Sequence, residues 1–300
     1  MSGKSRRDFL KTSALIGAGV TGISSAAKAG PKNILSEDRM GVLVDTTVCV
    51  GCRNCEWACK DSHNIPAGDL HSYEDRKILE SKRRPDHTAL TVVNEYAPGK
   101  NSNLPVDVKV QCMHCDHPAC VSACIVGAFS KHENGSVTWD TDMCIGCRYC
   151  MVACPFQVPA FEFDKAINPL IMKCDFCYER VKEGHIPACV GICPVEALTY
   201  GVRTDLVKIA RDKIKRNPDR YVDHIFGEYE VGGTSWMYLA SKNFDEIGFP
   251  DLGEKPAPGV SESIQHGIFA YFVPPVSLYA LLGGMMWISK RRKELDKEEV

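Results

Sequence analysis

The sequence predicts an α+β protein made of two nested small modules around bound metal, followed by one transmembrane helix near the C-terminus. Three observations lead to this prediction: sixteen Cys fall into four groups of four, part of the chain repeats itself, and residues 267–289 carry no charge. With 44% hydrophobic and 25% charged residues, the composition is that of an ordinary globular protein. A net charge of −2 argues against a nucleic-acid partner, which would require a strongly basic face.

The first residues have the pattern of an export signal. Residues 5–11 (Ser-Arg-Arg-Asp-Phe-Leu-Lys) contain an Arg pair, and an uncharged stretch rich in Ala and Gly runs from Thr12 to Ala27. A small-x-small cleavage site ends at Ala29. We therefore expect residues 1–29 to be a twin-arginine signal peptide. This route carries folded proteins, which suits a chain that receives its cofactors in the cytoplasm.

The C-terminal end has the pattern of a membrane anchor. Residues 267–289 form a charge-free run of 23 residues, long enough to cross a hydrocarbon core of about 30 Å. Four basic residues, 290–293, follow at once. The positive-inside rule then places the C-terminus in the cytoplasm and residues 30–263 outside it. We expect a single-pass protein at the periplasmic face of the inner membrane, in contact with the lipid bilayer.

The Cys groups indicate metal clusters. The first and third groups follow C-x₂-C-x₂-C-x₃-C, the second C-x₂-C-x₄-C-x₃-C, and the fourth C-x₂-C-x₁₁-C-x₃-C. Structural zinc uses isolated C-x₂-C pairs, whereas runs of four Cys with these gaps are typical of iron–sulfur clusters. No Cys lies outside the groups, which argues against a disulfide framework. We expect four [4Fe–4S] clusters, held by Cys49, Cys52, Cys55 and Cys59; Cys112, Cys115, Cys120 and Cys124; Cys144, Cys147, Cys150 and Cys154; and Cys174, Cys177, Cys189 and Cys193.

An internal repeat indicates how the groups are paired. Residues 45–59 and 140–154 are identical at nine of fifteen positions, and the second and fourth groups share Pro-Ala-Cys-Val-x-x-Cys. Short strands flanking Asn134-Gly135 predict a hairpin between the second and third groups. The equivalent strands of the first and fourth groups are residues 41–44 and 197–200. The inner two groups therefore form one module, and the outer two close around it.

This arrangement resembles two nested bacterial two-cluster ferredoxins. In such ferredoxins the fourth Cys of each run ligates the other cluster of the pair. The resemblance implies four mixed ligand sets: Cys49, Cys52, Cys55 and Cys193 for cluster 1; Cys174, Cys177, Cys189 and Cys59 for cluster 2; Cys112, Cys115, Cys120 and Cys154 for cluster 3; and Cys144, Cys147, Cys150 and Cys124 for cluster 4.

The whole pattern resembles the four-cluster iron–sulfur subunits of membrane-bound respiratory oxidoreductases, and among them the HybA-type subunits of hydrogenase-2. The likeness lies in Cys-Met-His-Cys at 112–115, in Cys-Arg-Tyr-Cys-Met-Val-Ala-Cys-Pro at 147–155, and in the two terminal signals. It implies a non-catalytic subunit that passes electrons from a periplasmic [NiFe] hydrogenase to an NrfD/HybB-like quinone-binding membrane subunit. A molybdopterin oxidoreductase or a multihaem cytochrome system as the catalytic partner remains the alternative.

The remaining residues carry no recognisable chemistry. We expect His63, His71 and His87 to be solvated, and His114 and His117 either to pack or to donate hydrogen bonds to cluster sulfurs. The expected parts of the chain are signal peptide 1–29, cluster domain 30–202 (inner module 112–154, outer module 40–59 with 174–201, insertion 60–111), packing region 203–248, linker 249–266, transmembrane helix 267–289 and cytoplasmic tail 290–300.

Overall fold

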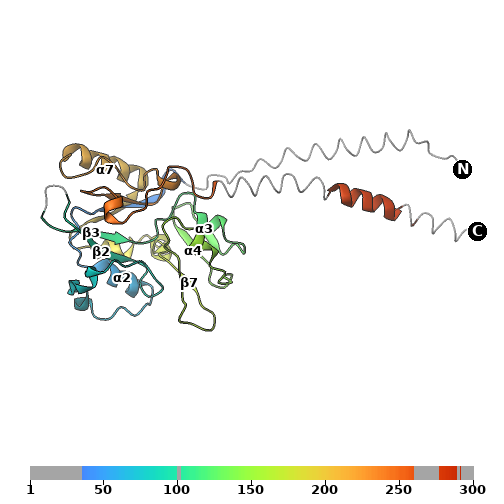
Figure 1. The fold of residues 1–300 in the computed structure, drawn as a ribbon, viewed down its shortest axis with the longest axis horizontal. Helices are drawn as coiled ribbons and strands as arrows, with labels where there is room; N and C mark the ends of the chain where they lie inside the picture. Colours follow the sequence, from blue (N-terminus) through green and yellow to red (C-terminus); the bar gives the residue numbers. More distant parts are fainter. Residues whose placement is uncertain (1–35, 100–102, 260–276, 289–290, 292–300) are drawn as a thin grey trace, which may run out of the picture. The chain divides into compact units, whose positions relative to one another are not determined.

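The structure is a computed structural model that describes residues 36–99, 103–259, 277–288 and 291 (Figure 1). The expected signal peptide, residues 1–29, lies outside the described residues, as does most of the expected cytoplasmic tail.

The described chain is mixed α/β with short elements. Its strands are β1 (Met40–Asp45), β2 (Val92–Tyr96), β3 (Val106–Val110), β4 (Phe129–Lys131), β5 (Val137–Trp139), β6 (Ala160–Phe161), β7 (Ile171–Met172), β8 (Leu198–Val202) and β9 (Trp236–Leu239). Its helices are α2 (Asn54–Ser62), α3 (Ala119–Ser122), α4 (Tyr149–Ala153), α5 (Tyr178–Lys182), α6 (Ala188–Gly191) and α7 (Arg203–Arg216), with 3₁₀ turns η2 (Leu70–Glu74), η3 (Arg76–Glu80), η4 (Glu230–Gly232) and η5 (Asp245–Ile247).

The strands of the outer Cys groups pair as the sequence predicts. β1 and β8 are antiparallel, with Val42 opposite Tyr200, and α2 of the first group packs against α6 of the fourth. A third strand, β9, joins the other edge of β1 in parallel, giving the order β8-β1-β9. This third strand extends the outer sheet.

The inner groups are joined by the predicted hairpin. β4 and β5 are antiparallel, with Phe129 opposite Trp139, and Gly135 adopts a φ of +92° in the connecting turn. Positive φ is readily adopted by Gly because it has no Cβ. Helices α3 and α4, of the second and third groups, pack against each other. The ferredoxin-type part of the predicted fold is therefore confirmed.

The insertion between the first and second groups is more ordered than its polar composition predicts. It contains the β2–β3 hairpin, in which Val93 and Val108 are almost fully buried. The buried carboxylate of Glu56 in α2 ties this hairpin to the first Cys group. It accepts a hydrogen bond of 2.6 Å from the Val93 N–H and forms ion pairs with Arg53 (3.2 Å) and Arg83.

Helix α7 follows β8 directly and buries one face. Its buried face, Leu206, Ala210 and Ile214, packs against Leu43 of β1 and Met237 of β9. Ile209, on the same helix, is 43% exposed. The segment after β8 therefore covers the outer sheet.

The expected C-terminal transmembrane helix is not found in the part of the chain that the structure describes. Among the residues that the structure describes, no helix is long and apolar enough to span a bilayer. Residues 277–288 are helical. Residues 267–276 and 289 lie outside the described residues. This finding corrects both the predicted fold class and the predicted single-pass location at the inner membrane.

Candidate metal centres

The repeated sequence of the first and third Cys groups gives a repeated backbone. Gly51 and Gly146 have φ of +65° and +67°, and the Arg two residues later, Arg53 and Arg148, have φ of +61° and +63°. Helices α2 and α4 begin directly after these Arg. A Cβ at Gly51 would lie 2.5 Å from Cγ of Asp107, so this loop requires Gly both for its conformation and for space.

The second and fourth groups also share local geometry. Pro118 and Pro187 cap the short helices α3 and α6, and each helix carries a Cys at its second position. Pro is favoured where a helix begins because its missing N–H would have no intrahelical partner there. In the Cys-x-x-Cys runs of these groups the third residues, His114 and Phe176, have φ of +50° and +69°.

One cavity is lined by Cys of two distant groups. Cys49, Cys52 and Cys55 of the first group face it together with Cys193 of the fourth. The pairing of β1 with β8 and the packing of α2 on α6 bring these groups together. Lys109 and Val93, from the β2–β3 hairpin, complete part of the wall.

A second cavity has the same character. Cys112, Cys115 and Cys120 of the second group line it together with Cys154 of the third. Val137 of β5 and Lys173 contribute to its wall. In both cavities, three Cys of one group meet the last Cys of another, which is the arrangement of a two-cluster ferredoxin.

The other thiols are also close to Cys of partner groups. Burial raises the pKa of the Cys150 thiol to about 11, and nearby Cys144, Cys147 and Cys124 add to the rise. Burial and then the neighbouring Cys59 raise the pKa of Cys174 well above its usual value. The neighbours come from the groups that the sequence pairs, while the assignment of each ligand to one cluster stays a prediction.

The donor set fits iron–sulfur clusters. All sixteen Cys have free thiols, and burial raises the pKa of most of them, including Cys55 and Cys115. Thiols with raised pKa stay protonated in the absence of metal, so binding must release protons. Four thiolates around one small cavity form the ligand set of a [4Fe–4S] cluster.

Three lysines with largely buried side chains lie among the Cys groups, and no sequence motif singles them out. Lys109 and Lys173 are 2% and 1% exposed, and the Lys131 side chain is 7% exposed. Lys109 donates a hydrogen bond of 2.8 Å to Gln111 and stacks 4.3 Å from the Trp236 ring. Burial disfavours the charged form of Lys109, but the negative charges that Cys189, Cys55 and Cys174 carry when they are ionised, as they are in a metal site, outweigh burial and raise its pKa.

Lys173 holds a similar position between groups. Its ammonium donates hydrogen bonds to the carbonyl oxygens of Val137 (2.5 Å) and Cys174 (2.9 Å), and its side chain lines the cavity of the second group. Lys131 lies 3.9 Å from Asp116, and burial lowers its pKa to about 8 despite that carboxylate. Positive charge is thus placed beside the Cys cavities inside the protein.

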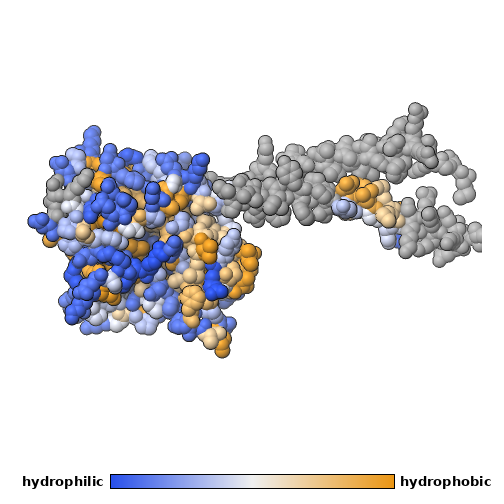
Figure 2. Space-filling view, in the orientation of Figure 1, coloured by the Kyte–Doolittle hydropathy of each residue, from blue (hydrophilic) through white to orange (hydrophobic). Residues whose placement is uncertain are grey.

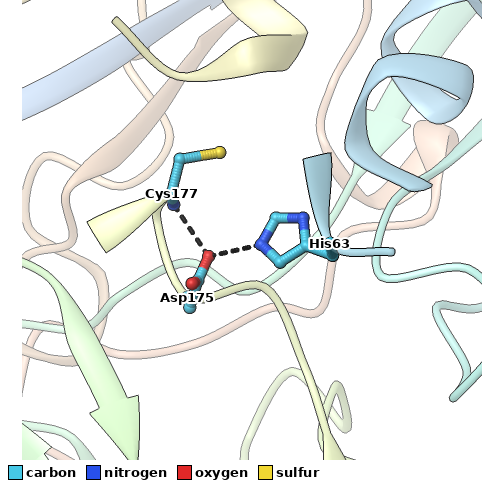
Figure 3. A group of neighbouring side chains, drawn as sticks. All are labelled: His63, Asp175 and Cys177. Atoms are coloured by element: carbon cyan, nitrogen blue, oxygen red, sulfur yellow. Dashed lines mark hydrogen bonds and ion pairs between the residues drawn. The ribbon is translucent and has the colours of Figure 1, made fainter. Parts of the chain in front are cut away.

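His63 is not solvated, contrary to our expectation. Its side chain is 16% exposed, and its Nε2 lies 2.8 Å from Oδ1 of Asp175 (Figure 3). The same Asp175 oxygen accepts a 2.8 Å hydrogen bond from the Cys177 N–H, and His63 Nδ1 lies 2.7 Å from the Cys59 carbonyl oxygen. Burial alone lowers the pKa of His63, but Asp175 and Cys59 raise it to about 12. The pair links the first Cys group to the fourth.

The ligand atoms of this trio lie within 4.8 Å of one another, a spacing that suits a metal ion. Cys177, however, belongs to one of the predicted cluster sets. The His63–Asp175 contact is therefore best explained as a clamp that holds Cys59 near the Cys of the fourth group.

His114, between two Cys of the second group, is fully buried. Its Nδ1 accepts a 2.8 Å hydrogen bond from the Val137 N–H, so the neutral ring carries its proton on Nε2. Burial and then the charges of Lys173, Lys131 and Lys109 hold its pKa well below the usual value, which keeps the ring neutral. Within the described residues Nε2 has no hydrogen-bond partner, and a cluster sulfur would fit as its acceptor.

Apolar side chains gather on the surface around the third Cys group. Figure 2 shows them on the side of the body that carries α3 and α4. Cys147 is itself exposed. We call the exposed large apolar residues of segment 125–167 the apolar patch; they are Ile125, Met143, Ile145, Tyr149, Val152, Phe163 and Ile167, which are between 49% and 82% exposed. A contiguous patch of this kind marks an interaction surface.

Comparison with known proteins gives consistent matches. A family model described as a 4Fe-4S dicluster domain matches residues 107–203. The chain is 47% identical to a protein of Nitratidesulfovibrio vulgaris, over 98% of this chain and 79% of the relative. It is 31% identical to the hydrogenase-2 operon protein HybA of Escherichia coli O157:H7, over 98% of this chain and 97% of that one. It is also 32% identical to the iron–sulfur subunit of the nitrate-inducible formate dehydrogenase of Escherichia coli K12, over 66% of each chain.

Proposed function

The chain belongs to the ferredoxin-type iron–sulfur subunits of respiratory oxidoreductases, and we propose that it relays electrons through four [4Fe–4S] clusters between a [NiFe] hydrogenase and an NrfD/HybB-like quinone-reactive membrane subunit. It is an electron-transfer subunit and is not itself catalytic. In this it is like its relatives, which are iron–sulfur subunits of oxidoreductase complexes. The cofactor class rests on the dicluster family match; the number of clusters and the partners are our proposal.

The observation that carries the proposal is the mixed composition of the two Cys cavities. Each contains three Cys of one group and the last Cys of another. We therefore propose cluster 1 on Cys49, Cys52, Cys55 and Cys193, and cluster 3 on Cys112, Cys115, Cys120 and Cys154. By the same rule cluster 2 takes Cys174, Cys177, Cys189 and Cys59, and cluster 4 takes Cys144, Cys147, Cys150 and Cys124. Residues 112–154 then form the inner module, and residues 40–59 with 174–201 the outer one.

The hydrogenase partner is supported by the near full-length match to HybA, whose name refers to hydrogenase-2. Matches to iron–sulfur subunits of formate dehydrogenase and dimethyl sulfoxide reductase cover smaller shares of the chain, 66% and 56%. They favour a molybdopterin oxidoreductase as the second candidate for the catalytic partner. The relay chemistry of this chain is the same in either complex.

The apolar patch supports the assignment of a membrane subunit to the inner module. Its members flank Cys144, Cys147 and Cys150 of proposed cluster 4 in the sequence, and the exposed Cys147 makes this cluster the one where an electron would leave or enter the chain. A desolvated apolar interface brings a partner close to an exposed cluster without burying unpaired charge.

Cluster content is tested by iron analysis and electron paramagnetic resonance of the purified full chain. We expect about sixteen iron atoms per chain and signals from four interacting [4Fe–4S] clusters. Stoichiometric zinc, or about eight iron atoms, would refute the four-cluster relay.

Partner identity is tested by purifying the complex in mild detergent and identifying its subunits. We expect hydrogenase subunits and an NrfD/HybB-like protein; molybdopterin subunits instead would support the second candidate. Val152→Asp places a charge on the apolar patch, where Val152 is 82% exposed, and should release the membrane subunit with iron content unchanged. Ile209→Asp on α7, 43% exposed, is the matched control and should retain it.

A further inference from the structure

A cavity of about 570 Å³ lies outside the four Cys groups. It is formed where several distant segments meet: residues 82–85 of the insertion, the ends of β2 and β3, residues 155–158 after the third group, and residues 247–250. Cavities of about 300–1,000 Å³ accommodate small organic ligands. The proposed relay makes no use of this space.

The rim of this cavity is positively charged. Lys82, Arg83 and Arg84 all contribute to the lining, which contains no Asp or Glu. Arg83 is paired with the buried Glu56 carboxylate, which lies outside the lining. Arg84 is exposed and donates a hydrogen bond to the neutral amide oxygen of Gln157. Lys82 donates to a backbone carbonyl and lies 4.6 Å from the Tyr96 ring centre. Two cations at the rim, Lys82 and Arg84, are thus hydrogen-bonded to neutral groups and not to a carboxylate.

The interior is apolar and aromatic, with a closed polar floor. Phe156, Phe249 and Val158 supply walls, the Asn94 amide is bonded to the Arg83 backbone, and Gln111 and Tyr238 supply the polar floor. Those polar groups already bond each other, since Gln111 Nε2 donates to Tyr238 Oη at 2.6 Å. Tyr238 Oη in turn donates to the Lys109 carbonyl oxygen at 3.0 Å. The polar groups of the floor are therefore already hydrogen-bonded, and the apolar part of a ligand fits there best.

The cavity also adjoins a proposed cluster. Met113, Pro155, Phe156 and Val158 line both this cavity and the one that contains Cys112 and Cys154. A ligand in the cavity would be separated from that site by a single layer of side chains.

We propose that this cavity binds a small amphipathic organic anion, a planar aromatic body with a carboxylate or phosphate held at the rim by Arg84 and Lys82. The aromatic body lies between Phe156 and Phe249, and the anionic group stays at the mouth. The binding itself stands on the cavity alone, whereas its closeness to cluster 3 rests on the proposed function. An anion there makes reduction of that cluster less favourable, because reduction adds negative charge nearby.

The test uses 2-naphthoate as the probe, titrated calorimetrically into the purified full chain with its iron content measured. We expect saturable binding with one site per chain. Arg84→Gln should weaken it about tenfold, the effect of one lost charge-assisted hydrogen bond, while Arg84→Lys should retain most of the affinity. Arg216→Gln, which removes an exposed Arg from α7, should leave binding unchanged.

Two further probes separate the parts of the proposal. Methyl 2-naphthoate, which lacks the charge, should bind weakly and equally to the wild type and to Arg84→Gln. Inorganic phosphate alone should not compete at equal concentration. Absence of saturable 2-naphthoate binding, or equal binding by Arg84→Gln, would overturn the proposal. Because calorimetry is independent of electron transfer, a failure here is distinct from a wrong cluster count, which iron analysis reports separately.

Discussion

Replacing Lys109 by Met should lower the reduction potentials of proposed clusters 1 and 2. Lys109 is 2% exposed and lines the cavity of Cys49, Cys52, Cys55 and Cys193. Burial lowers its pKa, but Cys189, Cys55 and Cys174, when ionised as cluster ligands, outweigh burial and raise the pKa. Its ammonium is therefore charged and lies close to both ligand sets. Each cluster gains a negative charge on reduction, so a nearby positive charge favours the reduced form.

The size of the shift follows from the position of the charge. At a separation of about 7 Å and an effective dielectric constant of about 20, two unit charges interact by about 2.4 kcal/mol. For a one-electron couple, in which 59 mV corresponds to a tenfold change, this equals about 100 mV. Full exposure to water would reduce the effect about fourfold. Because Lys109 is buried, the larger value applies.

The measurement is a redox titration followed by electron paramagnetic resonance. Lys109→Met should shift two of the cluster signals to lower potential by about 100 mV, whereas Lys109→Arg, which retains the charge, should shift them far less. Lys208→Met, at an exposed site of α7, should shift none. Unchanged potentials in Lys109→Met with full iron content would refute the electrostatic role assigned to this lysine.

Three further changes test the cluster sites and their support. Cys154→Ser should disrupt the cluster of the second group more than that of the third, and the opposite order of signal loss would rule out the exchange of ligands. Gly51→Ala should lose the iron of one cluster, since its Cβ would lie 2.5 Å from Asp107, whereas Gly68→Ala, with φ of +68° and no neighbour within 4 Å, should keep all iron. Glu56→Gln should lower unfolding stability by about 3 kcal/mol, because two Arg then lose a buried carboxylate; an unchanged thermal midpoint would contradict this.

The sequence predicted those parts of the fold that local chemistry determines. The repeat at residues 45–59 and 140–154 gives matching left-handed residues, Arg53 and Arg148, in both loops. Asn134-Gly135 correctly indicated the β4–β5 hairpin, and the outer strands pair as β1 with β8. Each of these features depends on residues close in sequence or on a copied motif.

Features that depend on distant contacts were missed. His63 lies in a polar segment, and only the fold brings it within 2.8 Å of Asp175, 112 residues away. The transmembrane prediction depended only on the number of uncharged residues in a row. That number does not determine whether those residues form one long apolar helix. The cavity beside the Cys112 and Cys154 site joins segments from residue 82 to residue 250, so no single stretch of sequence indicates it.

Strand β3 shows why an alternating pattern misleads in a protein of this kind. Residues 106–110 read Val-Asp-Val-Lys-Val, which predicts an apolar face toward a core and a polar face toward water. In the structure both faces are buried, with Asp107 3% and Lys109 2% exposed. The polar face is covered by the first Cys loop, where Gly51 meets Asp107, and by the cavity that Lys109 lines. Thiolates stabilise a nearby Lys ammonium, as water does. A strand that faces iron–sulfur ligands can therefore carry charged residues at the same alternating positions as a strand that faces solvent. Buried cations are therefore expected wherever a polar strand face adjoins a group of Cys.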